Sequence, residues 1–362
     1  MTSEYQTKSP KETIELGKKL AGRLKGGDVV LLYGELGSGK THFIKGIAEG
    51  LGIKMTIKSP TYAYVNKYPL NNDQSPIPND QLSASHKPYL YHYDLYRMEE
   101  GGDLSSIGFD ESLEDSKAIN VVEWADRMDE EFLEQYITVY LEGDKDRRNI
   151  EIKFISSAVL DQEFVESYYE EWGTPEHVRE HCKLVTKVAM QIAEACMQKG
   201  EIIDTNLLHT ACMLHDVNRV CDFKELKRDR FEEDVTDEKW EKWESCRKQF
   251  KGMHHADITA KILNERDFVE TAELIRLHKS TNIVDEPKAY NALEKQIIYY
   301  ADKRVAHSKI VDLAERFRDG RERYEKFDAI GNRELFDEVE KRTYELEKQL
   351  FEGLDIDSKD IK

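Results

Sequence analysis

The pattern of apolar residues changes in character partway along the chain. Up to about Lys153, short apolar runs rich in β-branched residues alternate with amphipathic stretches, and most of the glycines fall in this part. Beyond about Asp161, apolar residues recur at spacings of three and four with few strand signals. The pattern predicts two domains, the first α/β and the second an all-α helical bundle.

Four segments are expected from this change. The α/β domain is predicted over residues 1–156, a linker over 157–170, the helical domain over 171–330, and a charged helical extension with a frayed end over 331–362. Residues 69–88 are polar and rich in Pro, Asn, Asp and Ser, so they are predicted to form an exposed loop inserted into the first domain. No role for this loop follows from its composition.

Length and composition agree with two soluble domains. The 362 residues exceed the usual size of one hydrophobic core, and a hydrophobic content of 39% is enough to fill real cores. No run approaches the roughly 20 apolar residues of a membrane helix, and the polar N-terminus lacks the pattern of a signal peptide. A cytoplasmic protein without membrane contact is therefore expected.

The net charge and the cysteines limit which classes of partner and cofactor are expected. The formal net charge of −19 argues against indiscriminate binding to duplex nucleic acid. All five cysteines lie in the second half, and none form a CxxC pair, so reduced thiols are predicted in place of a disulfide framework or a thiolate zinc site. These cysteines are Cys182, Cys196, Cys212, Cys221 and Cys246.

A nucleotide-binding motif follows the first buried strand. Residues 28–33, DVVLLY, run directly into residues 34–41, GELGSGKT, and then into an amphipathic helical pattern. This is GxxxxGK[ST] with a strand before it and a helix after it, so backbone N–H groups are expected to wrap the phosphates of ATP, with Mg²⁺ beside them. The residues expected to bind the nucleotide are Glu35, Gly37, Ser38, Gly39, Lys40, Thr41 and His42.

Four more segments accompany this motif. They are TIELGKKLAGRL (residues 13–24), SPTY (59–62, opening an expected strand), YHYDLYR (91–97) and VVEW (121–124). Together with GELGSGKT they resemble, over about residues 10–155, the TsaE family of small ATPases of bacterial tRNA threonylcarbamoyladenosine (t6A) synthesis. The resemblance implies that this domain hydrolyses ATP while acting with the TsaB and TsaD proteins, and that it reaches tRNA indirectly through them.

Two carboxylates complete the implied ATPase site. Glu123 ends a buried strand, where open α/β sheets place site residues, and the resemblance makes it the Mg²⁺ partner of Thr41. Asp94 is implied to act near the γ-phosphate or the attacking water, beside a switch-like segment at residues 59–61. A helix cap with Arg97 as ion-pair partner remains open as the alternative role of Asp94.

The helical domain carries His and Asp residues on apolar helix faces. His181 shares a face with Val185 and Val188, and Asp302 shares one with Ile298 and Val305. Because an unpaired buried charge is costly, such residues are predicted to converge on one another or on metal ions.

Their order resembles the HD superfamily of metal-dependent phosphohydrolases, over about residues 171–325. The resemblance to its binuclear members implies one metal held by His181, His215, Asp216 and Asp302, with Asp216 bridging to a second metal held by His255 and His278. One or two divalent ions of Fe, Mn, Co or Zn suit this N/O ligand set, and two would clamp a phosphate and activate a water. A mononuclear domain would need neither His255 nor His278, and His254 competes with His255 for the position.

The substrate side of this domain is less determined. Arg219 follows the HisAsp pair and is expected to hold the phosphate of a nucleotide-like small-molecule substrate. Over both domains, the predicted catalytic residues are Asp94, Glu123, Asp216 and Arg219. Residues 224–251, dense in mixed charge, are predicted to be a solvated helical cover near the site mouth, or else a partner- or substrate-binding element. Two other functions remain open: a P-loop kinase for a small molecule, and a nucleotide-gated binding module whose HD domain is a catalytically silent sensor.

Overall fold

The computed structural model describes residues 3–70, 88–144, 146–156, 162–306, 308–325 and 333–362. The chain divides into two compact units, one of Met1–Val159 with Gly200–Ile202 and the other of Leu160–Lys199 with Ile203–Lys362. Most of the expected inserted loop at 69–88 and the start of the expected linker at 157–170 lie outside the described residues. No helix in the described part of the chain is both long enough and apolar enough to cross a membrane.

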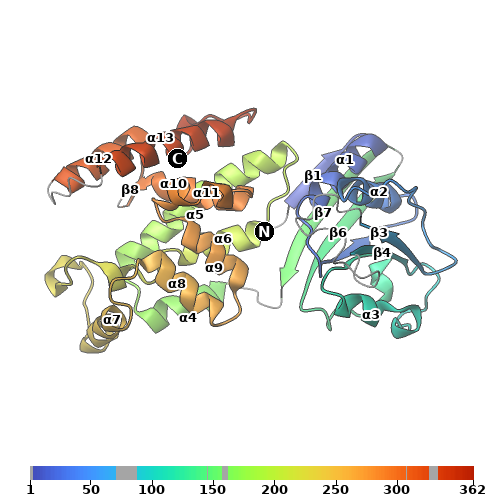
Figure 1. Ribbon diagram of the computed structural model, residues 1–362, viewed down its shortest axis with the longest axis horizontal. Helices are drawn as coiled ribbons and strands as arrows, with labels where there is room; N and C mark the ends of the chain where they lie inside the picture. Colours follow the sequence, from blue (N-terminus) through green and yellow to red (C-terminus); the bar gives the residue numbers. More distant parts are fainter. Residues whose placement is uncertain (1–2, 71–87, 145, 157–161, 307, 326–332) are drawn as a thin grey trace, which may run out of the picture. The chain divides into compact units, whose positions relative to one another are not determined.

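The first unit is built on a seven-stranded mixed sheet with strand order β1-β7-β6-β2-β5-β4-β3 (Figure 1). Strands β4, β5, β2 and β6 run parallel, whereas β3, β7 and β1 are antiparallel additions at the two edges. The strands are β1 Ser3–Thr7, β2 Val29–Tyr33, β3 Val65–Pro69, β4 Tyr89–Asp94, β5 Ile119–Glu123, β6 Gln135–Asp144 and β7 Arg147–Ser156. The helices are α1 Pro10–Ala21, α2 Lys40–Gly50 and α3 Phe109–Glu114.

Glycines set the distance between α1 and α2. A Cβ on Gly17 would lie 2.2 Å from the carbonyl oxygen of Phe43, and one on Gly46 would lie 2.0 Å from that of Ile14. Only glycine permits this backbone approach, which fixes the helix that begins at Lys40.

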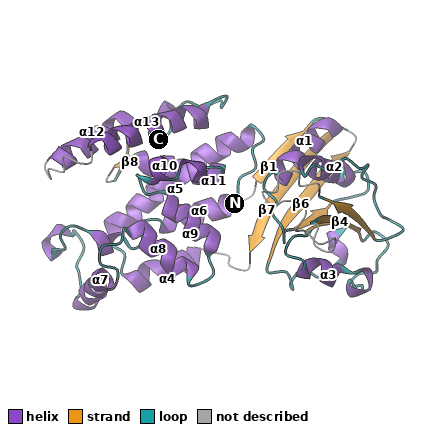
Figure 2. Ribbon diagram, viewed as in Figure 1, coloured by secondary structure: helices purple, strands orange, loops and turns teal. Residues whose placement is uncertain are grey.

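Among the residues that the structure describes, the second unit is helical apart from the short pair β8 Val305–Ala306 and β9 Lys309–Ile310 (Figure 2). Helices α5, α6, α9 and α11 pack on one another around one large apolar core. The helices are α4 Gln162–Trp172, α5 Glu176–Gln198, α6 Thr205–Leu214, α7 Asp237–Gln249, α8 His255–Asn264, α9 Val269–Leu277, α10 Asn282–Asp285, α11 Leu293–Lys303, α12 Leu313–Glu325 and α13 Arg333–Phe351. The two-domain prediction, α/β and then all-α, is thereby confirmed.

Both ends of this unit are more ordered than expected. Much of the segment expected as a linker forms helix α4, whose Val165 and Tyr169 are buried in the core. The expected fraying of the last residues is wrong, because Leu346 and Leu350 of α13 and Ile361 beyond it are buried in the same core.

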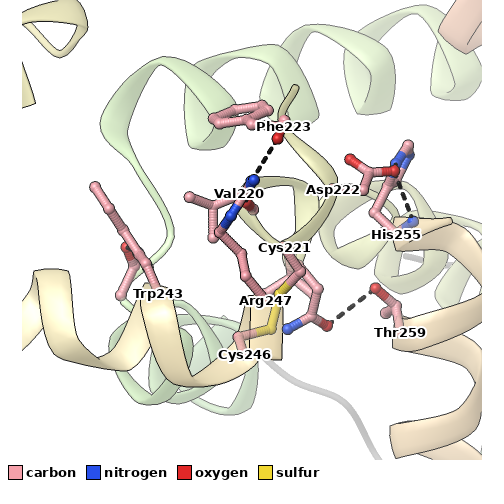
Figure 3. The surroundings of a disulfide bond; sticks show 12 residues. Val220, Cys221, Asp222, Phe223, Trp243, Cys246, Arg247, His255 and Thr259 are labelled. Carbon is pink, nitrogen blue, oxygen red and sulfur yellow. Dashed lines mark hydrogen bonds and ion pairs between the residues drawn. A yellow bond between two sulfur atoms is a disulfide. The ribbon is translucent and has the colours of Figure 1, made fainter. Parts of the chain in front are cut away.

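The prediction of reduced thiols is wrong for one pair. Cys221, in the 3₁₀ helix η3 Arg219–Asp222, is bonded to Cys246 of α7 (Figure 3), with Cα atoms 5.6 Å apart. Their sequence separation of 25 gives no sign of this, since it is the packing of α7 on η3 that brings them together. Cys182, Cys196 and Cys212 are free and buried.

Candidate functional site

The glycine-rich loop between β2 and α2 is shaped by close backbone contacts. Gly34 (φ 137°) and Gly39 (φ 107°) adopt conformations that favour glycine, and a Cβ on Gly39 would lie 2.3 Å from Arg148 Nε. Lys40 is buried and donates from Nζ to the carbonyl oxygens of Gly34, at 2.5 Å, and Glu35, at 3.1 Å. Burial lowers the pKa of Lys40, although nearby carboxylates such as Glu123 oppose the shift.

The other predicted nucleotide contacts lie on this loop and the first turn of α2. The Ser38 hydroxyl is buried without a hydrogen-bond partner in the described part of the chain, which leaves it free to donate to a phosphate oxygen. Gly37 (φ 85°) has open space where a Cβ would stand. His42 follows Thr41, and burial, with the charges of Lys45 and Arg148, lowers its pKa.

Glu123 and Thr41 lie together as the magnesium expectation requires. Thr41 Oγ1 is 3.5 Å from Glu123 Oε2, a separation that suits two ligands of one cation. The second carboxylate oxygen, Oε1, lies 2.8 Å from Nε2 of the fully buried His92. Sequence reasoning missed His92, although it stands in the same YHYDLYR segment as Asp94.

Asp94 lies beside Glu123 because β4 and β5 pair in parallel register at these two residues. Its Oδ2 accepts hydrogen bonds from the hydroxyls of Ser59 and Thr61, and its Oδ1 accepts one from the backbone N–H of Tyr96. No helix begins here, and Arg97 lies over the Tyr62 ring, 4.3 Å from its centroid. The helix cap with an Arg97 ion pair is therefore not what the structure shows.

The prediction that a strand begins at Ser59 is wrong. The backbone N–H groups of Ala63 and Tyr64 both donate to the carbonyl oxygen of Pro60, so residues 60–64 turn, and β3 starts only at Val65. Proline cannot donate to a strand ladder, and the turn directs the Ser59 and Thr61 hydroxyls at Asp94.

Arg148 is a buried cation that sequence reasoning missed. It lies on β7, 4% exposed, and donates from Nε to the carbonyl oxygen of Ser38 at 2.9 Å. The available signal was its alternation with Ile150 and Ile152, which places all three on the buried face of one strand. Arg148 thus holds the glycine-rich loop against the sheet.

In the second unit, the predicted His and Asp ligands converge from helices far apart in the sequence. His181 lies on α5, Asp302 on α11, and the other four at helix ends: His215 and Asp216 after α6, His255 at the start of α8, and His278 at the end of α9. His215 is fully buried, and His255 and His278 are each 3% exposed. This convergence is what the helical spacings predicted.

The ligand atoms form two groups that share Asp216. His181 Nε2 lies 3.2 Å from Asp302 Oδ1 and 4.0 Å from Asp216 Oδ2. The other carboxylate oxygen, Asp216 Oδ1, lies 2.8 Å from His255 Nε2 and 3.5 Å from His278 Nε2. The Asp216 carboxylate therefore faces both groups, the arrangement that a bridging ligand needs.

Hydrogen bonds to the backbone orient two of the imidazoles. His215 Nδ1 donates to the carbonyl oxygen of Cys212 at 2.7 Å, and His278 Nδ1 donates to that of Ile275 at 2.5 Å. Because a carbonyl only accepts, each Nδ1 carries the hydrogen, so that each ring in its neutral form presents the lone pair of Nε2 to the cluster. His215 Nε2 is buried without a hydrogen-bond partner among the described residues, so a cation ligated there would satisfy it.

The electrostatics keep the carboxylates charged. Burial alone would raise the pKa of Asp216, but the charges of His255 and His215 hold it well below its ordinary value. For Asp302, burial is likewise outweighed by Lys303, whose Nζ lies 2.6 Å from Oδ2, and by the hydrogen bond from His181. Burial lowers the pKa of His278 to about 4, which leaves this imidazole neutral at pH 7. Anionic carboxylates beside a neutral imidazole are a metal-binding combination.

A further group, formed by Asp222, His254 and His255, adjoins this centre. Asp222 Oδ2 accepts hydrogen bonds from Nδ1 and from the backbone N–H of His255, at 2.8 and 2.9 Å. His254 instead caps α8, where its Nδ1 accepts from the backbone N–H of Ala256, so it is His255 that reaches Asp216. Sequence reasoning missed Asp222 and Lys303, since neither occupies a position in the resembled motif.

Arg219 lies against the ligands themselves. Its Nη1 is 2.5 Å from His255 Nδ1 and 3.4 Å from Asp222 Oδ1, and its Nε is 3.9 Å from Asp216 Oδ2. We infer that His255 Nδ1 carries a hydrogen and donates it to Asp222, because an ionised carboxylate can only accept. The guanidinium thus places a positive charge at the edge of the cluster.

Comparison with known proteins divides the chain at the same place. The family model described as threonylcarbamoyl adenosine biosynthesis protein TsaE matches residues 7–150, and the HD domain model matches residues 178–306. The tRNA threonylcarbamoyladenosine biosynthesis protein TsaE of Bacillus subtilis is 35% identical over 146 residues, which are 40% of this chain and 81% of that protein. The TsaE of a Nostoc species is 34% identical over 169 residues, covering 44% of this chain and 94% of that one. The crystal structure of YdiB from Bacillus subtilis is 30% identical, with a TM-score of 0.31, and the match covers 42% of this chain and 84% of that chain.

Proposed function

Because the chain belongs to the TsaE family through its first domain and carries an HD domain in its second, we propose that it combines two phosphate-cleaving centres. The first, over residues 1–156, is an ATPase that serves t6A formation in tRNA. The second, over residues 171–330, is a metal-dependent phosphohydrolase that acts on a nucleotide-like substrate. Both would work in the cytoplasm, where tRNA is modified.

The ATPase proposal rests on the meeting of Asp94, Glu123 and Thr41 beside the glycine-rich loop. Bound Mg²⁺ would neutralise charge on the β- and γ-phosphates, and Thr41 and Glu123 are the residues that would hold it. Lys40 would exchange its loop carbonyl contacts for phosphate oxygens, and Asp94 would orient the attacking water. The hydroxyls of Ser59 and Thr61 keep the Asp94 carboxylate in place.

The partners follow from the family. We propose that TsaB and TsaD are the proteins served by ATP hydrolysis, and that tRNA is reached through them, since a chain of net charge −19 gains little from its own field. The similar proteins of Bacillus subtilis and Nostoc are named as tRNA threonylcarbamoyladenosine biosynthesis proteins, which supports a role in this pathway.

Product identity separates an ATPase from a kinase. We expect the purified chain to release free phosphate from ATP with Mg²⁺, and Lys40→Ala to lose ATP binding because the phosphates lose their buried cation. Lys45→Ala, on the same helix, is the matched control and should keep turnover. Transfer of the γ-phosphate to a small acceptor, with little free phosphate released, would favour the kinase alternative.

The phosphohydrolase proposal is carried by one observation, the convergence of buried ligands on the unpartnered Nε2 of His215. Two metal ions would polarise a phosphate and lower the pKa of a bound water. Arg219 would turn to the substrate phosphate, while Asp222 and Lys303 hold His255 and Asp302 in place. The residues that would hold the ions are His181, His215, Asp216, His255, His278 and Asp302.

Metal stoichiometry tests this proposal. We expect the full chain to bind up to two transition ions per molecule when Mn²⁺, Fe²⁺, Co²⁺ or Zn²⁺ is supplied without nucleotide. Asp216→Ala should lose both, because this carboxylate faces both ligand groups, whereas His278→Ala should lose one. His209→Ala, on α6 outside the cluster, is the control. A wild-type chain that binds none of these ions, and hydrolyses no phosphate ester in their presence, would contradict the proposal.

A further inference from the structure

Arg148 brings a buried positive charge to the glycine-rich loop from a distant strand. It lies on β7, opposite Gly143 of β6, and its side chain belongs to the buried part of the first unit. Taking a guanidinium out of water is costly unless its donors are used. Its Nε donates to the carbonyl oxygen of Ser38 at 2.9 Å, and its Nη1 donates to that of Asp146 at 3.4 Å. The first of these bonds joins β7 to the loop across 110 residues of sequence.

The Arg148 side chain also lies directly against the residue that follows Ser38. A Cβ on Gly39 would lie 2.3 Å from Arg148 Nε and 2.9 Å from its Cδ, so only glycine leaves room for the guanidinium in this position. Helix α2 begins at the next residue, Lys40. Arg148 therefore contacts both residues that the Ser38–Gly39 peptide bond joins.

This contact sets the direction of the Gly39 N–H. In a trans peptide, the carbonyl oxygen and the N–H that follows it point in opposite directions. Because Arg148 holds the Ser38 carbonyl oxygen, the Gly39 N–H points away from Arg148, and it donates to no acceptor among the residues that the structure describes. The Ser38 hydroxyl is likewise buried without a partner there. Two neighbouring donors are thus open to a ligand.

The loop needs such an external contact to keep one orientation. Gly39, with a φ of 107°, and Gly37, with a φ of 85°, both adopt conformations that favour glycine, and glycine is the residue whose backbone rotates most freely. A Cβ placed on Gly37 would meet no atom within 4 Å. Since the peptide planes of such a segment can turn, the bond from Arg148 to the Ser38 carbonyl selects one of their orientations.

The charge of Arg148 acts on the same part of the site. Burial is the main cause that lowers the pKa of His42, and the positive charges of Lys45 and Arg148 add to the shift. His42 lies in the first turn of α2, where the helix has its own partial positive charge. The charge and the open N–H groups therefore favour an anion in the same place.

We propose that Arg148 is a positioning residue of the ATPase site, whose bond to the Ser38 carbonyl oxygen presents the Gly39 N–H and the Ser38 hydroxyl to the β-phosphate of the nucleotide. The inference rests on the proposed ATPase function and adds the residue that prepares its phosphate-binding loop. Asp94 and Glu123 stand on β4 and β5, so the loss of Arg148 should weaken nucleotide binding more than it slows cleavage.

Three substitutions in the full-length chain separate the hydrogen bond from the charge. Arg148→Met places a methyl group where Nε stands, whereas Arg148→Gln keeps an N–H donor at the same position along the side chain without the charge. Arg148→Lys keeps the charge but carries its donor one bond farther out. Arg147→Met, at the exposed neighbouring residue of β7, is the matched control. All proteins, including the reference, carry Asp216→Ala so that the second centre does not contribute hydrolysis.

The first readout is the Kd for ADP by calorimetry, which requires no turnover and reports the number of sites separately from the affinity. We expect Arg148→Met to bind ADP about tenfold more weakly than the Arg147→Met control, the change that a loss of about 1.4 kcal/mol produces. Arg148→Gln should regain most of this affinity and Arg148→Lys should not. If Arg148→Met does not fold, the difference between the Gln and Lys variants decides. Equal affinities in these two, or tighter binding by the Lys variant, would overturn the proposal.

The second readout is steady-state ATP hydrolysis with Mg²⁺. We expect the KM of Arg148→Met to rise about tenfold while kcat stays near that of the reference, because the lost interaction is made equally in the ground state and the transition state. A tenfold fall in kcat with an unchanged KM would contradict the positioning role. If the reference binds ADP but hydrolyses no ATP, the ATPase proposal falls and the ADP affinities still decide the role of Arg148. If the reference hydrolyses ATP and all variants bind ADP equally, Arg148 has no such role and the ATPase proposal stands.

Discussion

At the scale of single residues, the sites depend on groups that hold other groups. His92 fixes one oxygen of Glu123 and leaves the other facing Thr41, and Lys303 and Asp222 act in the same way on Asp302 and His255. Such partners orient ligands and are costly to remove, because a buried charged group then lacks its hydrogen bond.

The first prediction concerns His92. His92→Leu should leave the Glu123 carboxylate without its buried hydrogen-bond partner, which should lower the free energy of unfolding by about 1 to 3 kcal/mol. Because the carboxylate is then no longer held in place, the Mg²⁺ concentration needed for half-maximal ATP hydrolysis should rise. His92→Gln keeps a donor and should restore most of the Mg²⁺ response. Identical Mg²⁺ titrations for Leu and Gln would show that His92 only fills space.

The second prediction concerns His177, whose ring stacks near Phe223 and Phe231. Burial lowers its pKa, with Glu233 and Glu232 opposing the shift. Because the folded state then binds fewer protons than the unfolded state, this group favours folding above its ordinary pKa of about 6.5 and loses that contribution as the pH falls below it. Thermal unfolding between pH 8 and pH 5.5 should therefore show a smaller fall in Tm for His177→Gln than for the wild type. Parallel curves would contradict this role.

At the scale of elements, helix α7 differs most from its expectation. Its charged sequence predicted a solvated cover, yet Trp243, Cys246 and the following Phe250 are buried, because three apolar side chains at helical spacings are enough to anchor one face. The disulfide to η3 then fixes the segment that carries Arg219 and Asp222.

The third prediction tests that bond. Reduction should lower the free energy of unfolding by about 3.5 kcal/mol, the chain-entropy value for a loop of this size, given the separation of 25 residues. Denaturant unfolding with and without a phosphine reductant measures the effect, and Cys221→Ala/Cys246→Ala should not respond to the reductant. A wild type equally stable under both conditions would show that the bond does not form in solution.

At the scale of the whole molecule, local signals predicted the architecture and contacts distant in sequence supplied the rest. At residues 28–50, strand, loop and helix follow one another in the order that the sequence predicted. Helical spacing alone also predicted that His181 and Asp302 point inward, where the structure brings them together. The contacts of the Ser59 and Thr61 hydroxyls with Asp94, and those of Arg148 with the glycine-rich loop, depend on partners more than 30 residues away. No local pattern encodes such pairings, so they could not be predicted. The roles assigned to the site residues stay predictions.

The central claim is that one chain holds two separate phosphate-cleaving centres, and a crosswise assay tests it most directly. Lys40→Ala and Asp216→Ala are each measured for ATP hydrolysis with Mg²⁺ and for p-nitrophenyl phosphate hydrolysis with Mn²⁺. We predict that Lys40→Ala loses only the first activity and Asp216→Ala only the second, because each variant removes a group from one site. Loss of both activities in either variant, or of neither, would contradict the account.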